Sequence, residues 1–152
     1  MNTSNVLTGA LLASLLLAKP DFSGDWTMSA ARSDFGPLPV PTSITRTITH
    51  AEPSITIIEQ QDSQMGGDQK MTRAYTTDGR EVAFQSSGFD VKSSAVWDGD
   101  ALVVVSDVNG AGVRFIDRMT LSDDGQTMTS KVHLSSAQGD ADLTIVFERK
   151  RP

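Results

Sequence analysis

The chain has 152 residues, of which 38% are hydrophobic and 21% charged, a composition typical of one folded domain with its own hydrophobic core. Its formal net charge of −6 argues against nucleic acid and against an anionic membrane surface as partners, because both attract basic proteins. The absence of cysteine excludes disulfides, thiolate metal sites and a cysteine nucleophile.

An apolar segment without charged side chains opens the chain, "MNTSNVLTGALLASLLLA". Its apolar run, Val6 to Ala18, is shorter than the roughly 20 residues that span a bilayer, so we expect no stable membrane insertion. The run has the length of a signal-peptide core, although no Lys or Arg precedes it. We predict a signal peptide over residues 1–18 and a single domain over residues 19–152 that is exported to the periplasm or the medium. A retained N-terminal helix packed on the domain is the alternative.

From Phe22 onward the sequence alternates with period two between regularly spaced turn residues. Asp-Gly and Asn-Gly pairs mark several of the turns, and these pairs favour the positive φ angles of tight hairpins. The breaks define ten predicted strands: Phe22–Ser29, Ser43–His50, Ser54–Gln61, Gln69–Thr76, Arg80–Ser86, Phe89–Trp97, Ala101–Asp107, Val113–Leu121, Thr127–Ser135 and Ala141–Arg149.

Short connections between these strands require antiparallel neighbours, because a parallel pair needs a crossover of a dozen residues or more. Ten such strands in simple order form an up-and-down meander with two exposed edges, and closure into a barrel removes these edges. We therefore predict an all-β, antiparallel, calycin-like barrel. A two-sheet sandwich is the competing architecture, but its Greek-key links are usually longer.

Some predicted strands mix polar and apolar residues on one face. Arg46 and His50 share the face of Ile44 and Ile48, and Asp117 joins the apolar face of its strand. Mixed faces suit a barrel whose interior is partly polar and holds a ligand or water. They also suit strand ends that emerge into solvent, which is the interpretation that we favour for Arg46 and His50.

A proline-rich segment, residues 36–41 within "ARSDFGPLPVPT", links the first two strands. Prolines at positions 37, 39 and 41 exclude a helix and most ladder pairing, and favour extended chain. We expect a packed connection anchored by Phe35. The alternative is a lid over the mouth of a barrel.

The stretch "FSGDW" at Phe22 to Trp26 resembles the Phe-x-Gly-x-Trp opening of the calycin superfamily, which includes lipocalins and fatty-acid-binding proteins. The whole segment after residue 18 is similar to uncharacterised exported bacterial lipocalin-like proteins in "FSGDW", "SDFGPLPVP", "YTTDGRE", "WDGD" and "LSDDGQTM". The resemblance implies that Trp26 lies across one end of the barrel under a cation from the last strand, Arg149 or its neighbours Lys150 and Arg151. Gly24 would let the first strand curve there.

The chain departs from the fatty-acid binders in two respects. The proline-rich segment replaces their helix pair, and Phe147-Glu148-Arg149 stands where they carry Arg-x-Tyr on the final strand. The chain has a single tyrosine, Tyr75. We therefore do not expect a carboxylate to be bound in their way.

Residues typical of catalysis or metal binding are sparse. His50 and His133 are the only histidines, and neither lies in a recognisable motif. Acidic turns such as "SDDGQT" lack the ligand pattern of a calcium loop. We expect no catalytic residue, no metal and no cofactor, and an enzyme with an acid or histidine at the barrel mouth is the alternative.

The function that we expect is non-enzymatic binding of a small apolar or amphipathic molecule inside the barrel. A barrel filled with side chains that acts through its surface, as an inhibitor or envelope component, is the alternative. An internal cavity of a few hundred Å³ separates the two, whereas an enzyme requires a histidine beside a carboxylate in a cleft. The sequence does not indicate the oligomeric state. The predicted pocket residues are Tyr75, Phe84, Trp97, Phe115 and Arg118.

Overall fold

The computed structural model describes residues 18–64 and 67–152, so the predicted signal peptide lies outside the described residues except for Ala18. The described chain forms ten strands and one short 3-10 helix, η1 (Ala30–Arg32). None of its helices has the length and apolar character needed to cross a membrane. The strands are β1 (Gly24–Met28), β2 (Ser43–Ala51), β3 (Ser54–Asp62), β4 (Gln69–Thr76), β5 (Val82–Ser86), β6 (Phe89–Asp98), β7 (Ala101–Val108), β8 (Val113–Leu121), β9 (Thr127–Ser136) and β10 (Gly139–Arg149).

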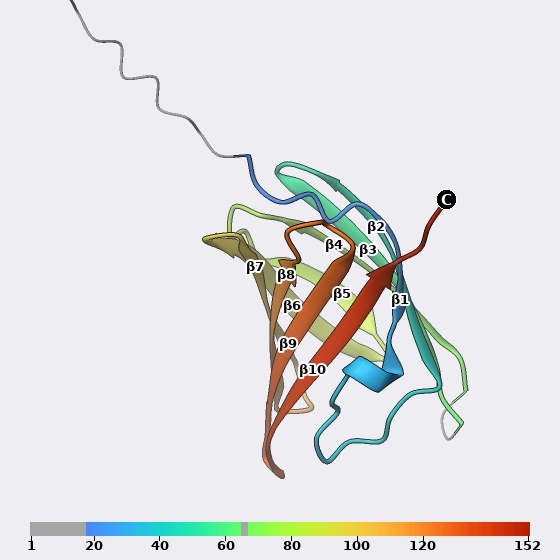
Figure 1. Cartoon of the computed structure of the whole chain (residues 1–152). Helices are drawn as coiled ribbons and strands as arrows, with labels where there is room; N and C mark the ends of the chain where they lie inside the picture. Colours follow the sequence, from blue (N-terminus) through green and yellow to red (C-terminus); the bar gives the residue numbers. More distant parts are fainter. Residues whose placement is uncertain (1–17, 65–66) are drawn as a thin grey trace, which may run out of the picture.

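All ten strands belong to one antiparallel sheet in the order β4-β3-β2-β1-β10-β9-β8-β7-β6-β5. The sheet curls into a barrel (Figure 1), and β1 joins its two halves by pairing with both β2 and β10. The predicted all-β antiparallel barrel is thereby confirmed.

One seam of the barrel, between β4 and β5, is closed by side chains rather than by a backbone ladder. The Ser86 hydroxyl donates to Met71 Sδ across the seam at 3.5 Å. The rings of Tyr75 and Phe84 meet edge to face, with their centroids 6.5 Å apart. The barrel is therefore closed by hydrogen-bonded strands everywhere except along this line.

The predicted strand bounds are close to the observed ones, and Gln69–Thr76 and Val113–Leu121 coincide with β4 and β8. The first strand is shorter than predicted, because Phe22 and Ser23 do not join the backbone ladder. Phe22 bonds to the His50 side chain, and Ser23 bonds to the His50 backbone through its own side chain. The Phe22 amide donates to His50 Nδ1 at 3.3 Å, and the Ser23 hydroxyl donates to the His50 carbonyl at 3.0 Å.

The connection from β1 to β2 crosses the lower end of the barrel in Figure 1. Asp34 forms two backbone hydrogen bonds with Thr144 of β10, with N–O distances of 2.7 and 2.8 Å. Phe35 is buried, whereas Val40 is 62% exposed. The connection is thus packed on the barrel with Phe35 as its anchor, as predicted.

Candidate functional site

A cavity of about 370 Å³ lies inside the barrel. Its wall is mainly apolar and draws side chains from most strands. The connection between β1 and β2 also contributes Leu38 and two of its prolines, so it both packs on the barrel and covers part of the cavity. Representative apolar lining residues are Ile44, Ile57, Met71, Val104 and Leu143.

Three of the five predicted pocket residues, Tyr75, Phe84 and Phe115, line this cavity. Trp97 and Arg118 do not. Trp97 faces inward but lies at the other end of the barrel, where it stacks on Phe22 with ring centroids 6.0 Å apart. Arg118 points away from the interior and forms an ion pair with Asp98 at 2.6 Å.

A charged cluster in the cavity wall consists of Arg46, Glu59, Arg73 and Asp117. The expectation that Arg46 emerges into solvent is wrong, because its side chain is 5% exposed. Arg46 lies in the middle of β2, where period-two alternation with Ile44 and Ile48 points it inward. The same alternation was the signal in the sequence for Glu59 and Asp117, but it could not show that their partners lie on other strands.

Glu59 binds both arginines of the cluster through one oxygen. Its Oε2 accepts from Arg46 Nε at 2.6 Å and from Arg73 Nη2 at 2.8 Å. Burial alone would raise the pKa of Glu59, but the two guanidinium charges outweigh it and lower the pKa to about 2. Glu59 is therefore a permanent anion at physiological pH.

Asp117 contacts Arg46 directly, in an ion pair of 3.9 Å between its Oδ2 and Arg46 Nη2, and also through a serine. Arg46 Nη1 donates to Ser130 Oγ at 3.0 Å, and Ser130 Oγ donates to Asp117 Oδ2 at 3.3 Å. The Arg46 guanidinium also lies 4.4 Å from the centroid of the Phe147 ring. Burial raises the pKa of Asp117, while the nearby arginines oppose this shift.

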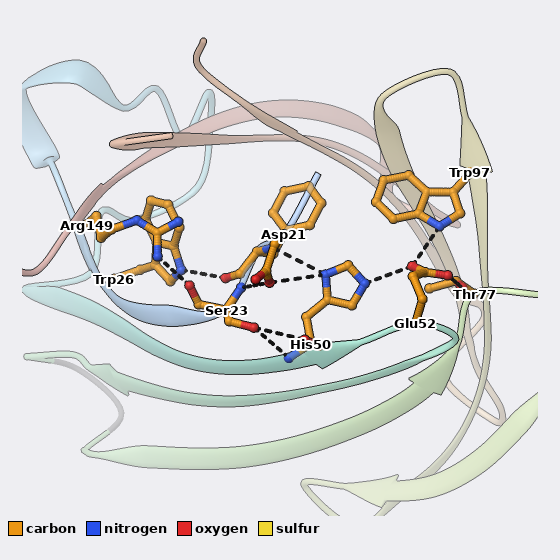
Figure 2. A network of polar contacts seen from close by, with 9 residues as sticks. Asp21, Ser23, Trp26, His50, Glu52, Thr77, Trp97 and Arg149 are labelled. Atoms are coloured by element: carbon orange, nitrogen blue, oxygen red, sulfur yellow. Dashed lines mark hydrogen bonds and ion pairs between the residues drawn. The ribbon is translucent and has the colours of Figure 1, made fainter. Parts of the chain in front are cut away.

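Trp26 and Arg149 lie together in a second cluster of contacts (Figure 2). Their positions are paired across β1 and β10, and the guanidinium lies 4.3 Å from the indole centroid. Arg149 also donates to the Ser23 carbonyl. Gly24 has φ of +135°, and a Cβ there would collide with the Arg149 guanidinium, so both its backbone and the available space favour glycine. Trp26 is fully buried and does not line the cavity.

His50 is buried in the same region, so the expectation that it emerges into solvent is also wrong. Its Nδ1 accepts from the Phe22 amide, and its Nε2 lies 2.8 Å from Glu52 Oε1. Glu52 also accepts from Trp97 Nε1 at 3.0 Å and from the Thr77 hydroxyl at 2.7 Å, as Figure 2 shows. This network fastens the segment before β1 to the turn between β2 and β3.

The two histidines lie beside carboxylates but outside the cavity wall. His133 lies on the outer surface with its Nδ1 2.6 Å from Asp142, and this hydrogen bond raises the pKa of His133. Within residues 18–64 and 67–152, no group of three or more potential ligands could hold a metal ion. Each histidine thus has the neighbouring carboxylate that the enzyme alternative requires, but neither histidine lies in the wall of the cavity.

No known family model matches the sequence, and no curated protein matches it. Solved structures do match. A secretory abundant heat soluble protein from Ramazzottius varieornatus has a TM-score of 0.65 at 13% identity, covering 84% of this chain and 94% of its own. Zebrafish ileal bile acid-binding protein in complex with cholic acid has a TM-score of 0.61 at 14% identity, covering 85% and 98%.

Fatty-acid-binding protein 1 of Echinococcus granulosus gives a TM-score of 0.59 at 10% identity, covering 86% of this chain and 98% of its own. At such low identities the likeness concerns the fold. It agrees with the ten-stranded antiparallel barrel described above. The chain shares its barrel fold with these proteins.

Proposed function

We propose that this protein is a non-enzymatic barrel that binds a small apolar or amphipathic molecule in its interior. The observation that carries the proposal is the cavity of about 370 Å³ inside the barrel. Its volume falls in the usual range of small-molecule sites, and its wall combines apolar side chains with a few polar ones, as such sites do. A barrel filled with its own side chains would leave no such space.

The structural neighbours support the same function. One was solved with cholic acid and another is a fatty-acid-binding protein, so barrels of this shape accommodate amphipathic molecules. In this chain the polar part of a ligand would lie against Arg73 and Asp117, and its apolar part against Leu38 and Phe115.

Native mass spectrometry of protein purified from its source tests the proposal. We expect a co-purified small molecule that is released on denaturation. Val104→Phe, which fills part of the cavity, should lose this molecule. Val103→Phe makes the same change at the adjacent position, whose side chain points to the other face of β7, and should retain it. Equal ligand content in both variants would contradict binding in the interior.

We also propose that residues 1–18 direct export and are removed after Ala18. The apolar core of this segment supports the proposal, as does the resemblance to exported bacterial proteins. Lys19 already belongs to the folded domain, because its Nζ donates to the Gly99 carbonyl at 3.0 Å and lies 5.4 Å from the centroid of the Trp97 ring. Cleavage after Ala18 would leave these contacts in place.

A further inference from the structure

Three polar atoms of the cavity wall have no hydrogen-bond partner among the described residues. They are Arg73 Nε, the Tyr75 hydroxyl oxygen and Asp117 Oδ1. All three atoms are buried, and their residues line the same cavity. Since buried polar atoms in folded proteins are almost always hydrogen-bonded, these three atoms mark the part of the wall that can receive a polar group.

Arg46 and Arg73 differ in how fully they are engaged. Arg46 binds Glu59 through Nε and Ser130 through Nη1, and its Nη2 lies 3.9 Å from Asp117 Oδ2. Its guanidinium also lies against the Phe147 ring. Arg73 binds Glu59 through Nη2 and keeps its Nε–H unpaired. The cationic donor still available to a ligand is therefore on Arg73.

The charge of the wall depends on Asp117. Across the barrel it faces Arg46 of β2, Glu59 of β3, and Arg73 and Tyr75 of β4. The strands beside it, β7 and β9, present the non-ionisable Val104, Ser106, Ser130 and Val132 to the interior. Asp117 is therefore the one carboxyl group of this cluster whose pKa stays raised by burial despite the nearby arginines, whereas two arginines hold Glu59 ionised.

The net charge of the cluster differs between the ionised and the protonated state of Asp117. When Asp117 is ionised, the two arginines are cancelled by two carboxylates, and an incoming anion would lie beside an uncompensated acceptor, Oδ1. When Asp117 is protonated, one positive charge is left over. Arg73 Nε, the Tyr75 hydroxyl and the Asp117 carboxyl can then all act as hydrogen-bond donors in the wall of the same cavity.

Building on the interior-binding function proposed above, we propose that this wall binds the anionic head group of an amphipathic acid, with Asp117 protonated in the complex. The proton comes from solvent whenever Asp117 is ionised in the free protein. The complex then contains two arginines, one Glu59 carboxylate and one ligand carboxylate, so its charges balance. The subsite lies on β4 and β8 and does not involve the final strand.

Proton linkage gives the inference a measurable consequence. Where binding takes up one proton, the affinity for an acid falls by about tenfold per pH unit as pH rises. An alcohol with the same chain brings no charge and should not show this decrease. Glu59, Arg73 and Tyr75 do not titrate near neutral pH, because their pKa values are displaced further from it.

The deciding experiment uses decanoate and decanol with the full folded domain at about pH 8. Infrared spectra of the decanoate complex should show a protonated-carboxyl band, and this band should be missing from the complex of Asp117→Asn. Asparagine is permanently neutral and keeps a donor, so Asp117→Asn should bind decanoate at least as tightly as the parent protein in calorimetry. Asp107→Asn makes the same change in an exposed ion pair with Arg114 and should match the parent protein.

Each outcome of this experiment supports or overturns a specific claim. The band in the parent complex, together with retained binding by Asp117→Asn, supports the inference. A decanoate complex without the band, loss of decanoate binding in Asp117→Asn, or binding of decanol but not of decanoate overturns the inference and leaves interior binding standing. Failure of both probes to bind would overturn the interior-binding function together with the inference.

Discussion

Trp26 shows how much one side chain contributes to closing this barrel. It is fully buried, its indole Nε1 donates to the Phe22 carbonyl at 3.0 Å, and Arg149 covers its face. A cation over an indole ring contributes about 0.5–2 kcal/mol, depending on how far it is desolvated. Trp26 does not line the cavity, so a substitution of Trp26 should change the stability of the protein without changing its affinity for a ligand.

Trp26→Ala should lower the free energy of unfolding by about 3–5 kcal/mol, as is usual for truncating a buried tryptophan. Affinity for decanol should change little once the variant is folded, because the cavity wall is intact. Urea denaturation and calorimetry measure the two effects. Arg149→Met, which keeps the stem and removes the cation, serves as a milder control. A large loss of affinity with unchanged melting would place Trp26 in the binding site instead.

The low pKa of Glu59 predicts that the free energy of unfolding falls as the solution is acidified. Its pKa is lowered from 4.5 to about 2 in the folded state, so its stabilising effect is complete above pH 4.5 and is lost as pH falls towards 2. The loss amounts to up to about 3 kcal/mol. Unfolding free energies measured across this range should fall more steeply for the parent protein than for Glu59→Gln.

At neutral pH Glu59→Gln should itself be less stable by about 3–5 kcal/mol, because it leaves Arg46 and Arg73 without their shared carboxylate. Glu81→Gln is a suitable control, since Glu81 forms only an exposed pair with Lys92 at 3.5 Å. Parallel acid profiles for Glu59→Gln and the parent protein would contradict the assignment.

At the level of the elements, the sequence predicts the bounds of the strands well, but it predicts the contacts between side chains inside the barrel only in part. Period-two alternation and Asp-Gly turns are local, so the bounds of β4 and β8 could be predicted to the residue. The Arg46–Glu59–Arg73 cluster is not local, because it needs the registry of β2, β3 and β4. Whether the inward-pointing Arg46 finds a partner or reaches solvent depends on that register. His50 is buried for a different reason, because the segment before β1 and Glu52 of the following turn cover it.

The segment between β1 and β2 also combines two roles that the sequence presented as alternatives. Phe35 packs it on the barrel, while Leu38, Pro39 and Pro41 line the cavity. The segment turns at Gly36 and Pro37, where the Leu38 amide donates to the Phe35 carbonyl at 3.0 Å. The restricted φ angles of its prolines lower the entropy that is lost when it covers the cavity.

Phe35→Ala should loosen this segment more than the barrel. We expect amide exchange over residues 30–42 to become several-fold faster while exchange in β8 and β9 is unchanged, because the Phe35 anchor is lost and the ladders are not. Decanol should dissociate faster in stopped-flow measurements. Val40→Ala, a truncation of an exposed residue in the same segment, is the matched control. Unchanged exchange and dissociation in Phe35→Ala would show that Phe35 does not anchor the cover.

For the whole molecule, export can be tested directly by expressing the full chain in a bacterial host. We expect protein in the periplasm or the medium whose N-terminal residue is Lys19, because the apolar core would direct secretion and Ala18 would precede the cut. Terminal sequencing and intact mass measure this outcome. Ala18→Arg should block processing. Full-length protein confined to the cytosol would contradict the proposal.

The pairing of β1 with β10 has a consequence for how the chain reaches its native state. Every other hydrogen-bonded strand pair is consecutive in the chain, so each can form as a local hairpin. The β1–β10 ladder joins positions at nearly opposite ends of the domain, such as Trp26 and Arg149, and must await closure of a very long loop. A circular permutant with the old ends linked and new ends opened between β4 and β5 would turn this ladder into a local one without breaking any other. Such a permutant should fold faster than the parent protein, and the difference would measure the kinetic cost of long-range closure.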